Sequence, residues 1–259
     1  MERERPSAAN AAQAARSEPK ANGESERTET MYRKFLTARS PLRVLEKGLH
    51  GGLGQGNVGL VLAGRGVGKS SFLVGVALDD LLRGGRVLHV ALDQTVTHVR
   101  DYYDTVFADL RATTQLADGA VVQGEIEQLR SIRAVASAGF SAAKVREAVQ
   151  LTEAAGGKPS AVIVDGWDVA RASAGDLDAL CALAKEIPAE IWVSALAPSE
   201  KITALPAQFA AARDKFAVIL ALEPEAGAVG LRVLKDHENP NPEALRVALD
   251  PRTLLLKRS

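Results

Sequence analysis

The sequence predicts an α/β protein with a mostly parallel β-sheet, helices on both faces of the sheet and an antiparallel extension at the C-terminus. Along most of the chain, short apolar runs alternate with segments of helical periodicity, a pattern typical of parallel strands connected by helices. Near the C-terminus, short apolar runs are separated instead by Asn-Pro and Asp-Pro turns, which favour antiparallel pairing. Apolar residues make up 46% of the 259 residues and charged residues 25%, which allows one substantial packed core.

The first strand is expected at Val58–Ala63, a continuous apolar run of the kind that a strand buried on both faces requires. A helix is expected to follow at Lys69–Leu82, where Ala, Leu and Val recur with helical spacing. Further strands are expected at residues 86–92, 160–165, 190–195 and 216–222, and closing strands at 230–234, 245–249 and 254–256. Further helices are expected at residues 95–110, 126–138, 141–155, 177–186 and 206–214.

The N-terminal segment differs from the rest of the chain. Residues 1–30 contain almost no large apolar side chain and show no periodicity, so we expect a disordered tail. The alternative is a docking segment that folds on a partner. Residues 31–259 are expected to form a single domain, and the apolar side chains between residues 31 and 49 predict a short helix and an extended piece that lie against it.

Charge and hydropathy limit the classes of partner. Lys plus Arg and Asp plus Glu both number 32, so no global electrostatic field would draw the chain to nucleic acid or to an anionic membrane. Apolar runs of about 18 residues and a secretory signal are absent from the sequence, which predicts a cytoplasmic protein that does not enter membranes. A single cysteine, Cys181, excludes an intramolecular disulfide and is read as a small core or interface residue.

The segment between the first strand and the first helix has the composition of a phosphate-binding loop. Residues 63–70, Ala-Gly-Arg-Gly-Val-Gly-Lys-Ser, match the Walker A pattern with Ala in place of the first Gly. We expect Lys69 to place a positive charge on the β- and γ-phosphates of ATP and Ser70 to supply an oxygen ligand for Mg²⁺. The residues expected to bind the nucleotide are Gly64, Arg65, Gly66, Val67, Gly68, Lys69, Ser70 and Ser71.

Two carboxylates at strand ends complete the expected catalytic set with Lys69. Asp165 ends the run Ala161–Asp165, a Walker B pattern in which the carboxylate holds a water on Mg²⁺. Asp93 follows the second strand and can polarise the water that attacks the γ-phosphate. The alternative interpretation is that Asp93 caps the next helix.

These residues carry a family resemblance over residues 40–258. The stretch 45–70, with Gly51-Gly52-Leu53 ahead of the phosphate loop, resembles RecA-superfamily ATPases, nearest the KaiC and RadA-like branch. Residues 90–93, 162–165, 231–237 and 246–250 are similar to the strand with the catalytic acid, to Walker B, to a strand with a Lys-x-Arg motif and to a closing hairpin of that family.

The resemblance implies a RecA-like core that binds ATP with Mg²⁺ and assembles side by side, so that a Lys and an Arg of the neighbouring subunit complete each site. Lys235 matches the Lys, and His237 stands where the Arg is usual. His lacks the bidentate fork of Arg, and Asp93 is one methylene shorter than the family's Glu, so slow hydrolysis is expected. The end of the fourth expected strand, residues 194–197, lacks the family's Gln.

The leading hypothesis is a slow or regulatory Mg²⁺-dependent ATPase whose nucleotide state controls assembly or the binding of a protein partner. The alternatives are a nucleotide-dependent scaffold that does not hydrolyse ATP and a DNA recombination or repair accessory ATPase. Nucleic acid is the weaker partner, because residues 197–206 contain only Lys201 as a basic side chain and the segment 223–227 is acidic and would repel phosphates.

Overall fold

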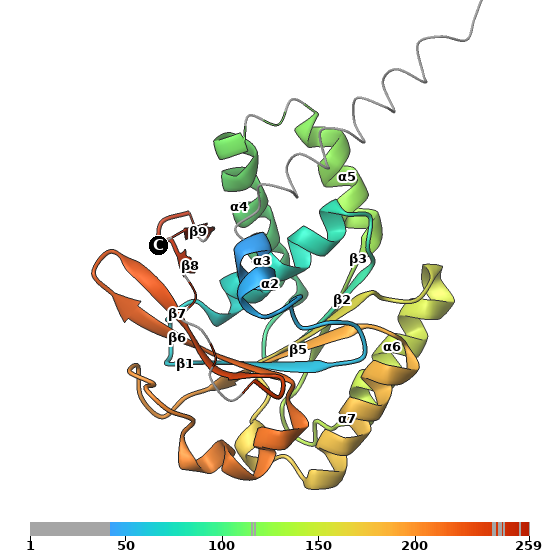
Figure 1. Ribbon diagram of the computed structural model, residues 1–259. Helices are drawn as coiled ribbons and strands as arrows, with labels where there is room; N and C mark the ends of the chain where they lie inside the picture. Colours follow the sequence, from blue (N-terminus) through green and yellow to red (C-terminus); the bar gives the residue numbers. More distant parts are fainter. Residues whose placement is uncertain are drawn as a thin grey trace, which may run out of the picture.

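The computed structural model describes residues 42–114, 116, 118–239, 242, 245, 247–253 and 255–258. Within these residues, nine strands form one sheet in the order β3-β2-β4-β5-β1-β6-β7-β8-β9 (Figure 1). The strands are β1 (Val58–Ala63), β2 (Val87–Leu92), β3 (Arg130–Val135), β4 (Ala161–Asp165), β5 (Glu190–Leu196), β6 (Val218–Glu225), β7 (Ala228–Asp236), β8 (Val247–Leu249) and β9 (Leu256–Arg258). The expected tail, residues 1–30, lies outside the described residues.

The helices connect the strands and cover both faces of the sheet. They are α2 (Leu42–Gly48), α3 (Lys69–Leu82), α4 (Val96–Thr114), α5 (Gly119–Leu129), α6 (Ala142–Gly156) and α7 (Ala174–Glu186), with two 3₁₀ segments, η1 (Val169–Arg171) and η2 (Ala207–Lys215). In Figure 1, α4 and α5 lie above the sheet, and α6 and α7 cover its other face, at the right and lower right of the picture. The predicted α/β architecture with a mostly parallel sheet is confirmed.

The six strands from β3 to β6 are parallel and form the centre of the molecule. Every residue of β1, β2 and β4 is buried. These strands have no alternation of polar and apolar residues because helices cover both sides of the sheet. Each face therefore has its own apolar cluster. The upper apolar cluster lies between the sheet and α2 to α5, and the lower apolar cluster lies between the sheet and α6, α7 and the 3₁₀ segments.

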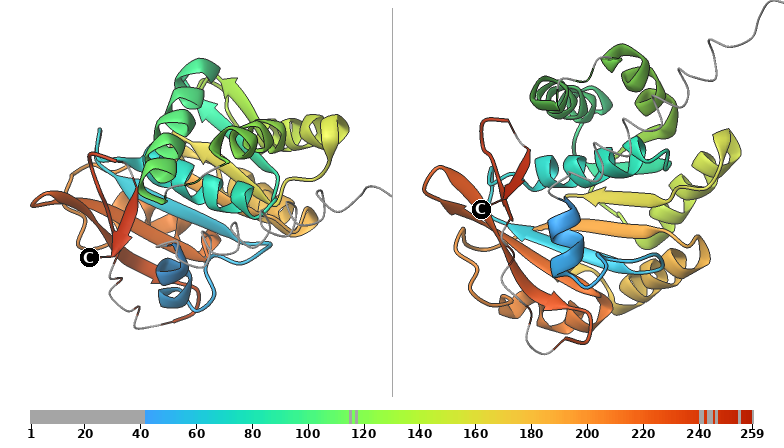
Figure 2. Two further views of the ribbon diagram at one scale, coloured as in Figure 1. Left: turned by 90° about the horizontal axis from the view of Figure 1, so that it is seen from above. Right: turned by 45° about the horizontal axis from the view of Figure 1, so that its top comes forward.

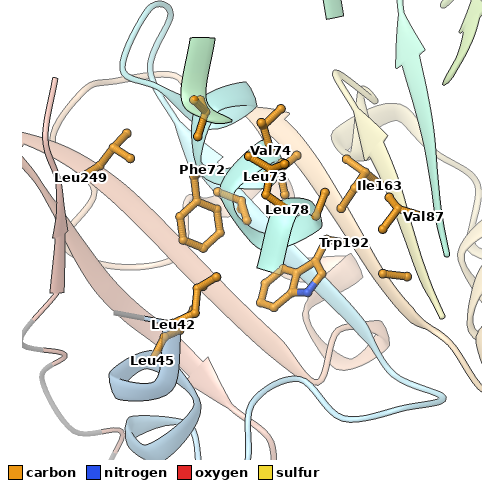
Figure 3. Close-up of a cluster of buried hydrophobic side chains, with 14 of the residues drawn as sticks. Leu42, Leu45, Phe72, Leu73, Val74, Leu78, Val87, Ile163, Trp192 and Leu249 are labelled. Carbon is orange, nitrogen blue, oxygen red and sulfur yellow. The ribbon is translucent and has the colours of Figure 1, made fainter. Parts of the chain in front are cut away.

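Helix α3 is the most deeply packed helix of the upper cluster. Figure 3 shows Phe72 and Leu78 of this helix directed toward Trp192 of β5, with Leu42 and Leu45 of α2 nearby. Phe72 is fully buried, and its ring meets Trp192 edge to face with centroids 6.2 Å apart. Burial of such side chains removes about 1.5–3 kcal/mol each of unfavourable apolar hydration, so this contact fixes the start of α3 against the sheet.

The C-terminal part is antiparallel, as predicted. Strands β6 and β7 form a hairpin, and β8 and β9 extend the sheet beyond β7 (Figure 2). The hairpin turn contains Gly227, whose φ of 75° lies in the left-handed region that suits glycine. The segment 223–227 is therefore mostly strand and tight turn. Glu223 is buried, accepts from the N–H of Ile202 and pairs with Arg232 Nε at 2.8 Å, so it is not the free acidic loop expected from the sequence.

One expected element is wrong. A helix was expected over residues 126–138, but α5 ends at Leu129 and residues 130–135 form β3, the edge strand beside β2. The charged residues that obscured the strand suit an edge position. Arg130 lies over the ring of Tyr103 at 4.6 Å, and Ile132 packs against the upper apolar cluster. No helix among the described residues combines the length and apolar character needed to cross a membrane.

Candidate functional site

The candidate site lies at the carboxyl ends of the neighbouring parallel strands β2, β4, β5 and β1. The helix after β1 packs on one face of the sheet, whereas the helix after β4 packs on the other face. Ligands of open α/β sheets bind at such a position, because connections that leave on opposite faces open a crevice at the carboxyl ends of the strands.

The glycine-rich loop, residues 63–70, connects the carboxyl end of β1 to α3. Gly66 and Gly68 have φ values of 75° and 111°. A Cβ at Gly68 would lie 2.7 Å from Cδ2 of Leu249 in β8, whereas a Cβ at Gly66 would meet no atom within 4 Å. Gly68 therefore serves both backbone conformation and close packing, and Gly66 serves conformation only. The loop presents the N-terminus of a 14-residue helix, where unpaired N–H groups favour anions.

The side chain of Lys69 is folded back over the glycine-rich loop. Lys69 Nζ donates to the carbonyl oxygens of Ala63 at 3.2 Å and Gly64 at 3.0 Å. Partial burial lowers the pKa of the Lys69 ammonium; the nearby Asp165 carboxylate opposes this shift and the charge of Arg65 adds to it. A bound phosphate would place a negative charge beside this partly desolvated ammonium and so stabilise its charged form.

The remaining residues of the expected nucleotide-binding set divide by exposure. Arg65 and Gly66 are exposed, and Lys69 and Ser70 are partly exposed. Val67 and Ser71 are buried. Gly68 is also partly exposed, and Gly64 is buried. The side chains of Val67 and Ser71 therefore pack in the interior, and any contact of these two residues with a ligand would be through the backbone.

Asp165 is the centre of a polar cluster at the carboxyl end of β4. Ser70 Oγ donates to Oδ2 of Asp165 at 2.6 Å, and Gln94 Nε2 donates to the same oxygen at 3.1 Å. Ser194 Oγ donates to Oδ1 at 2.5 Å and accepts from the N–H of Gly166 at 2.9 Å. Asp165 is 2% exposed, so these donors supply the hydrogen bonds that a buried carboxylate requires. The structure thus brings together Ser70 and Asp165, the two residues expected to hold Mg²⁺.

A buried histidine extends this cluster into the core. His89 Nδ1 lies 3.1 Å from the hydroxyl of Tyr103, and His89 Nε2 lies 4.0 Å from Oδ2 of Asp165. His89 Nε2 has no hydrogen-bond partner among the described residues. Burial lowers the pKa of His89 to about 4, although the Asp165 charge opposes this. A neutral ring that accepts from Tyr103 directs its Nε2–H toward Asp165.

Sequence reasoning assigned no role to Gln94, Ser194 or His89. Ser194 pairs with Asp165 in the β4–β5 register, and Ala91, between His89 and Gln94, pairs with Asp165 in the β2–β4 register. The signal that could have found them is therefore the alignment of strand ends, which requires the order of the strands in the sheet.

Asp93 has a different environment from the one expected. Its Oδ1 accepts from the N–H of Ser137 at 2.9 Å, its own N–H donates to Val135, and its φ is 55°. The hydrogen bonds from Ser137 lower the pKa of the exposed Asp93 carboxyl. Asp93 does not cap α4, because Thr95 Oγ1 accepts from the N–H of His98 there. The side chain instead closes the loop after β3, and its proposed role toward an attacking water stays a prediction.

Lys235 and His237, the expected trans-acting pair, lie at the end of β7. Lys235 is buried, and its Nζ donates to the carbonyl of Phe216 at 2.7 Å and to that of Arg213 at 3.3 Å. His237 Nδ1 lies 2.9 Å from Asp236 Oδ1, and its Nε2 lies 3.2 Å from the carbonyl of Leu53. Both side chains are bonded within the subunit, so Lys235 would have to leave two carbonyls to reach a neighbour.

A cavity of about 300 Å³ adjoins His237, and it is formed by the loop before β1 and the end of β7. His50 Nδ1 lies 2.8 Å from Oδ2 of the buried Asp236, so Asp236 binds a histidine through each oxygen. This cavity lies at the amino end of β1, opposite the glycine-rich loop. It is therefore separate from the Ser70–Asp165 cluster.

The Asp165 cluster fits a magnesium ion that arrives with a phosphate ligand. Within the described part of the chain, no group of three or more His, Cys, Asp or Glu side chains is placed to hold a metal. Mg²⁺ needs no such cage, because it keeps several waters and binds through one or two protein oxygens and the substrate phosphates. Ser70 Oγ and Asp165 Oδ2 would supply those protein contacts.

No protein-family model matches the chain, and no curated protein matches it in sequence. The function of the protein is therefore inferred from the residues of the site itself.

Proposed function

We propose that this protein binds ATP with Mg²⁺ through residues 63–70 and hydrolyses it slowly, as a RecA-like P-loop ATPase. The observation that carries the proposal is the 2.6 Å hydrogen bond between Ser70 Oγ and Asp165 Oδ2. In P-loop NTPases, the loop Ser or Thr and a strand-end Asp are the two protein groups that hold Mg²⁺. Here these residue types meet although 95 positions separate them in the sequence.

Each part of the site has a separate role in this proposal. The backbone N–H groups of the glycine-rich loop and the N-terminus of α3 bind the phosphates. Lys69 neutralises charge on the β- and γ-phosphates, and Ser70 and Asp165 hold the metal, which would stabilise the charge that develops on the phosphates. Ser194 orients Asp165 through the hydrogen bond to Oδ1, the oxygen that the loop does not contact, and His89 lies 4.0 Å from Oδ2.

The proposal also includes control of assembly or of partner binding by the bound nucleotide. A nucleotide-dependent change in assembly or in the binding of a protein partner would transmit the state of the site, and Lys235 and His237 would act on a neighbouring subunit's nucleotide. A scaffold that binds ATP without hydrolysis is the second candidate, because the carboxylate of Asp93 is held by the N–H of Ser137. A role on DNA is less favoured than either.

Phosphate release distinguishes the two candidates. Wild type and Lys69→Ala should be compared in MgATP, with Lys144→Ala, an exposed lysine on α6, as the matched control. We expect slow release by wild type and Lys144→Ala and a loss of at least about tenfold in Lys69→Ala. Equal background rates in all three proteins, combined with tight ATP binding by wild type, would identify the scaffold.

A further inference from the structure

The two residues that follow β2 point to different places. Asp93, at a φ of 55°, places its carboxylate on the N–H of Ser137, in the loop that follows β3. Gln94 directs its side chain to the Asp165 cluster, where Nε2 lies 3.1 Å from Oδ2 of Asp165. Gln94 is partly buried, whereas Asp93 is exposed. The side chain that reaches the candidate metal pair from β2 is therefore an amide.

The contact with Asp165 also determines which end of the Gln94 amide can bind another group. An ionised carboxylate only accepts hydrogen bonds, so the NH₂ group of Gln94 must face Asp165 and the carbonyl oxygen Oε1 must point away from it. No hydrogen bond to Oε1 is present among the described residues. Oε1 can therefore accept a hydrogen bond from a water molecule beside the Ser70–Asp165 pair.

We propose that Gln94, and not Asp93, positions the water that attacks the γ-phosphate. This inference rests on the proposed function. The amide oxygen of Gln94 accepts one O–H of the water and thereby directs an oxygen lone pair at the γ-phosphorus, a role that glutamine has in other phosphoryl-transfer sites. Asp165 holds the amide through Nε2, and the hydroxyls of Ser70 and Ser194 hold Asp165.

The chemical step follows from the fact that an amide is not a base. The water oxygen forms a bond to the γ-phosphorus as the bond from phosphorus to the β,γ-bridging oxygen breaks, and ADP leaves with that electron pair. The water proton passes to an oxygen of the transferred phosphoryl group, so ATP⁴⁻ and water give ADP³⁻ and H₂PO₄⁻. Gln94 orients the water but accepts no proton, which makes slow hydrolysis the expected behaviour.

Binding of a transition-state analogue tests this role without turnover. Wild type, Gln94→Ala, Asp93→Ala and Lys69→Ala should be titrated in Mg²⁺ with a non-hydrolysable ATP analogue and with ADP plus aluminium fluoride. We expect Gln94→Ala to bind the ATP analogue within about threefold of wild type but the aluminium fluoride complex at least about tenfold more weakly. Phosphate release should fall by a similar factor, and Asp93→Ala should lose less of its affinity for the aluminium fluoride complex than Gln94→Ala does.

Three results would overturn the assignment. In the first, Asp93→Ala loses the aluminium fluoride complex and Gln94→Ala retains it. In the second, neither variant loses it. In the third, Gln94→Ala loses both ligands equally, which would mean that Gln94 only supports ground-state binding through Asp165. Failure of the proposed function gives a different pattern, because wild type would then bind both nucleotides no better than Lys69→Ala.

Discussion

The hydroxyl of Ser70, at the start of α3, donates a 2.6 Å hydrogen bond to Oδ2 of Asp165, at the end of β4. Asp165 is buried, and its Oδ1 accepts a hydrogen bond from Ser194 Oγ. These contacts hold the carboxylate in position without a ligand. Such a preformed pair of oxygens suits the proposed Mg²⁺, which proteins commonly contact through few groups.

Removal of either oxygen should uncouple nucleotide binding from magnesium. We expect Ser70→Ala and Asp165→Asn to reduce the gain in ATP affinity that Mg²⁺ provides by about tenfold or more, because each removes one protein contact of the metal. Affinities measured by fluorescence titration with Mg²⁺ and with a chelator would check this. Ser199→Ala, which changes an exposed serine outside the cluster, is the control, and a normal magnesium effect in Asp165→Asn would contradict the metal assignment.

Two glycines close together in sequence should respond to alanine in opposite directions. Gly68→Ala places a Cβ at a φ of 111° and 2.7 Å from Leu249, so we expect a loss of stability of about 1–3 kcal/mol and of nucleotide binding. Gly75 lies inside α3 with open space around its Cβ position, so Gly75→Ala should stabilise the protein by about 0.5–1 kcal/mol. Urea unfolding of both variants measures this, and equal effects would refute the loop geometry.

The edge-to-face contact of Phe72 in α3 and Trp192 in β5 should contribute strongly to the stability of the fold beside the candidate site. Phe72→Ala removes a fully buried ring and should destabilise the fold by about 3–5 kcal/mol. Phe72→Leu retains most of the apolar volume and should cost less. Unfolding midpoints in urea give the comparison; a loss below about 1 kcal/mol for Phe72→Ala would show that α3 is not anchored there.

Acid should weaken the link between β7 and the loop before β1. Burial of Asp236 opposes its ionisation, but hydrogen bonds from His237, His50 and Asn239 outweigh this and lower the pKa of its carboxyl. A lowered folded-state pKa stabilises the protein above the unfolded value, and the stabilisation is lost as pH falls through the folded-state pKa. Asp236→Asn should therefore be less stable than wild type at pH 7, and the difference should shrink below about pH 4. A difference that grows in acid would contradict this.

Much of this arrangement could be predicted from local sequence. Strand β1, helix α3 and the loop between them were predicted with their observed bounds, because a continuous apolar run, three glycines and helical periodicity meet there. The β3 strand was missed because Arg130 and Arg133 interrupt its apolar character, and only the neighbouring β2 makes residues 130–135 a strand.

The contacts of Asp165 could be predicted only in part. The strand-end position of Asp165 and the loop position of Ser70 are visible in sequence, but the contribution of Gln94 depends on the left-handed backbone of Asp93, which turns one side chain away and the next inward. The partners Ser194 and His89 come from strands whose order in the sheet no local pattern specifies.

Calorimetric titration of MgATP into wild type and Lys69→Ala tests the central claim most directly. Wild type should bind one nucleotide per chain, and Lys69→Ala, which lacks the ammonium above the glycine-rich loop, should bind at least about tenfold more weakly. No binding to wild type, or the same affinity in both proteins, would contradict the claim that residues 63–70 form a phosphate site.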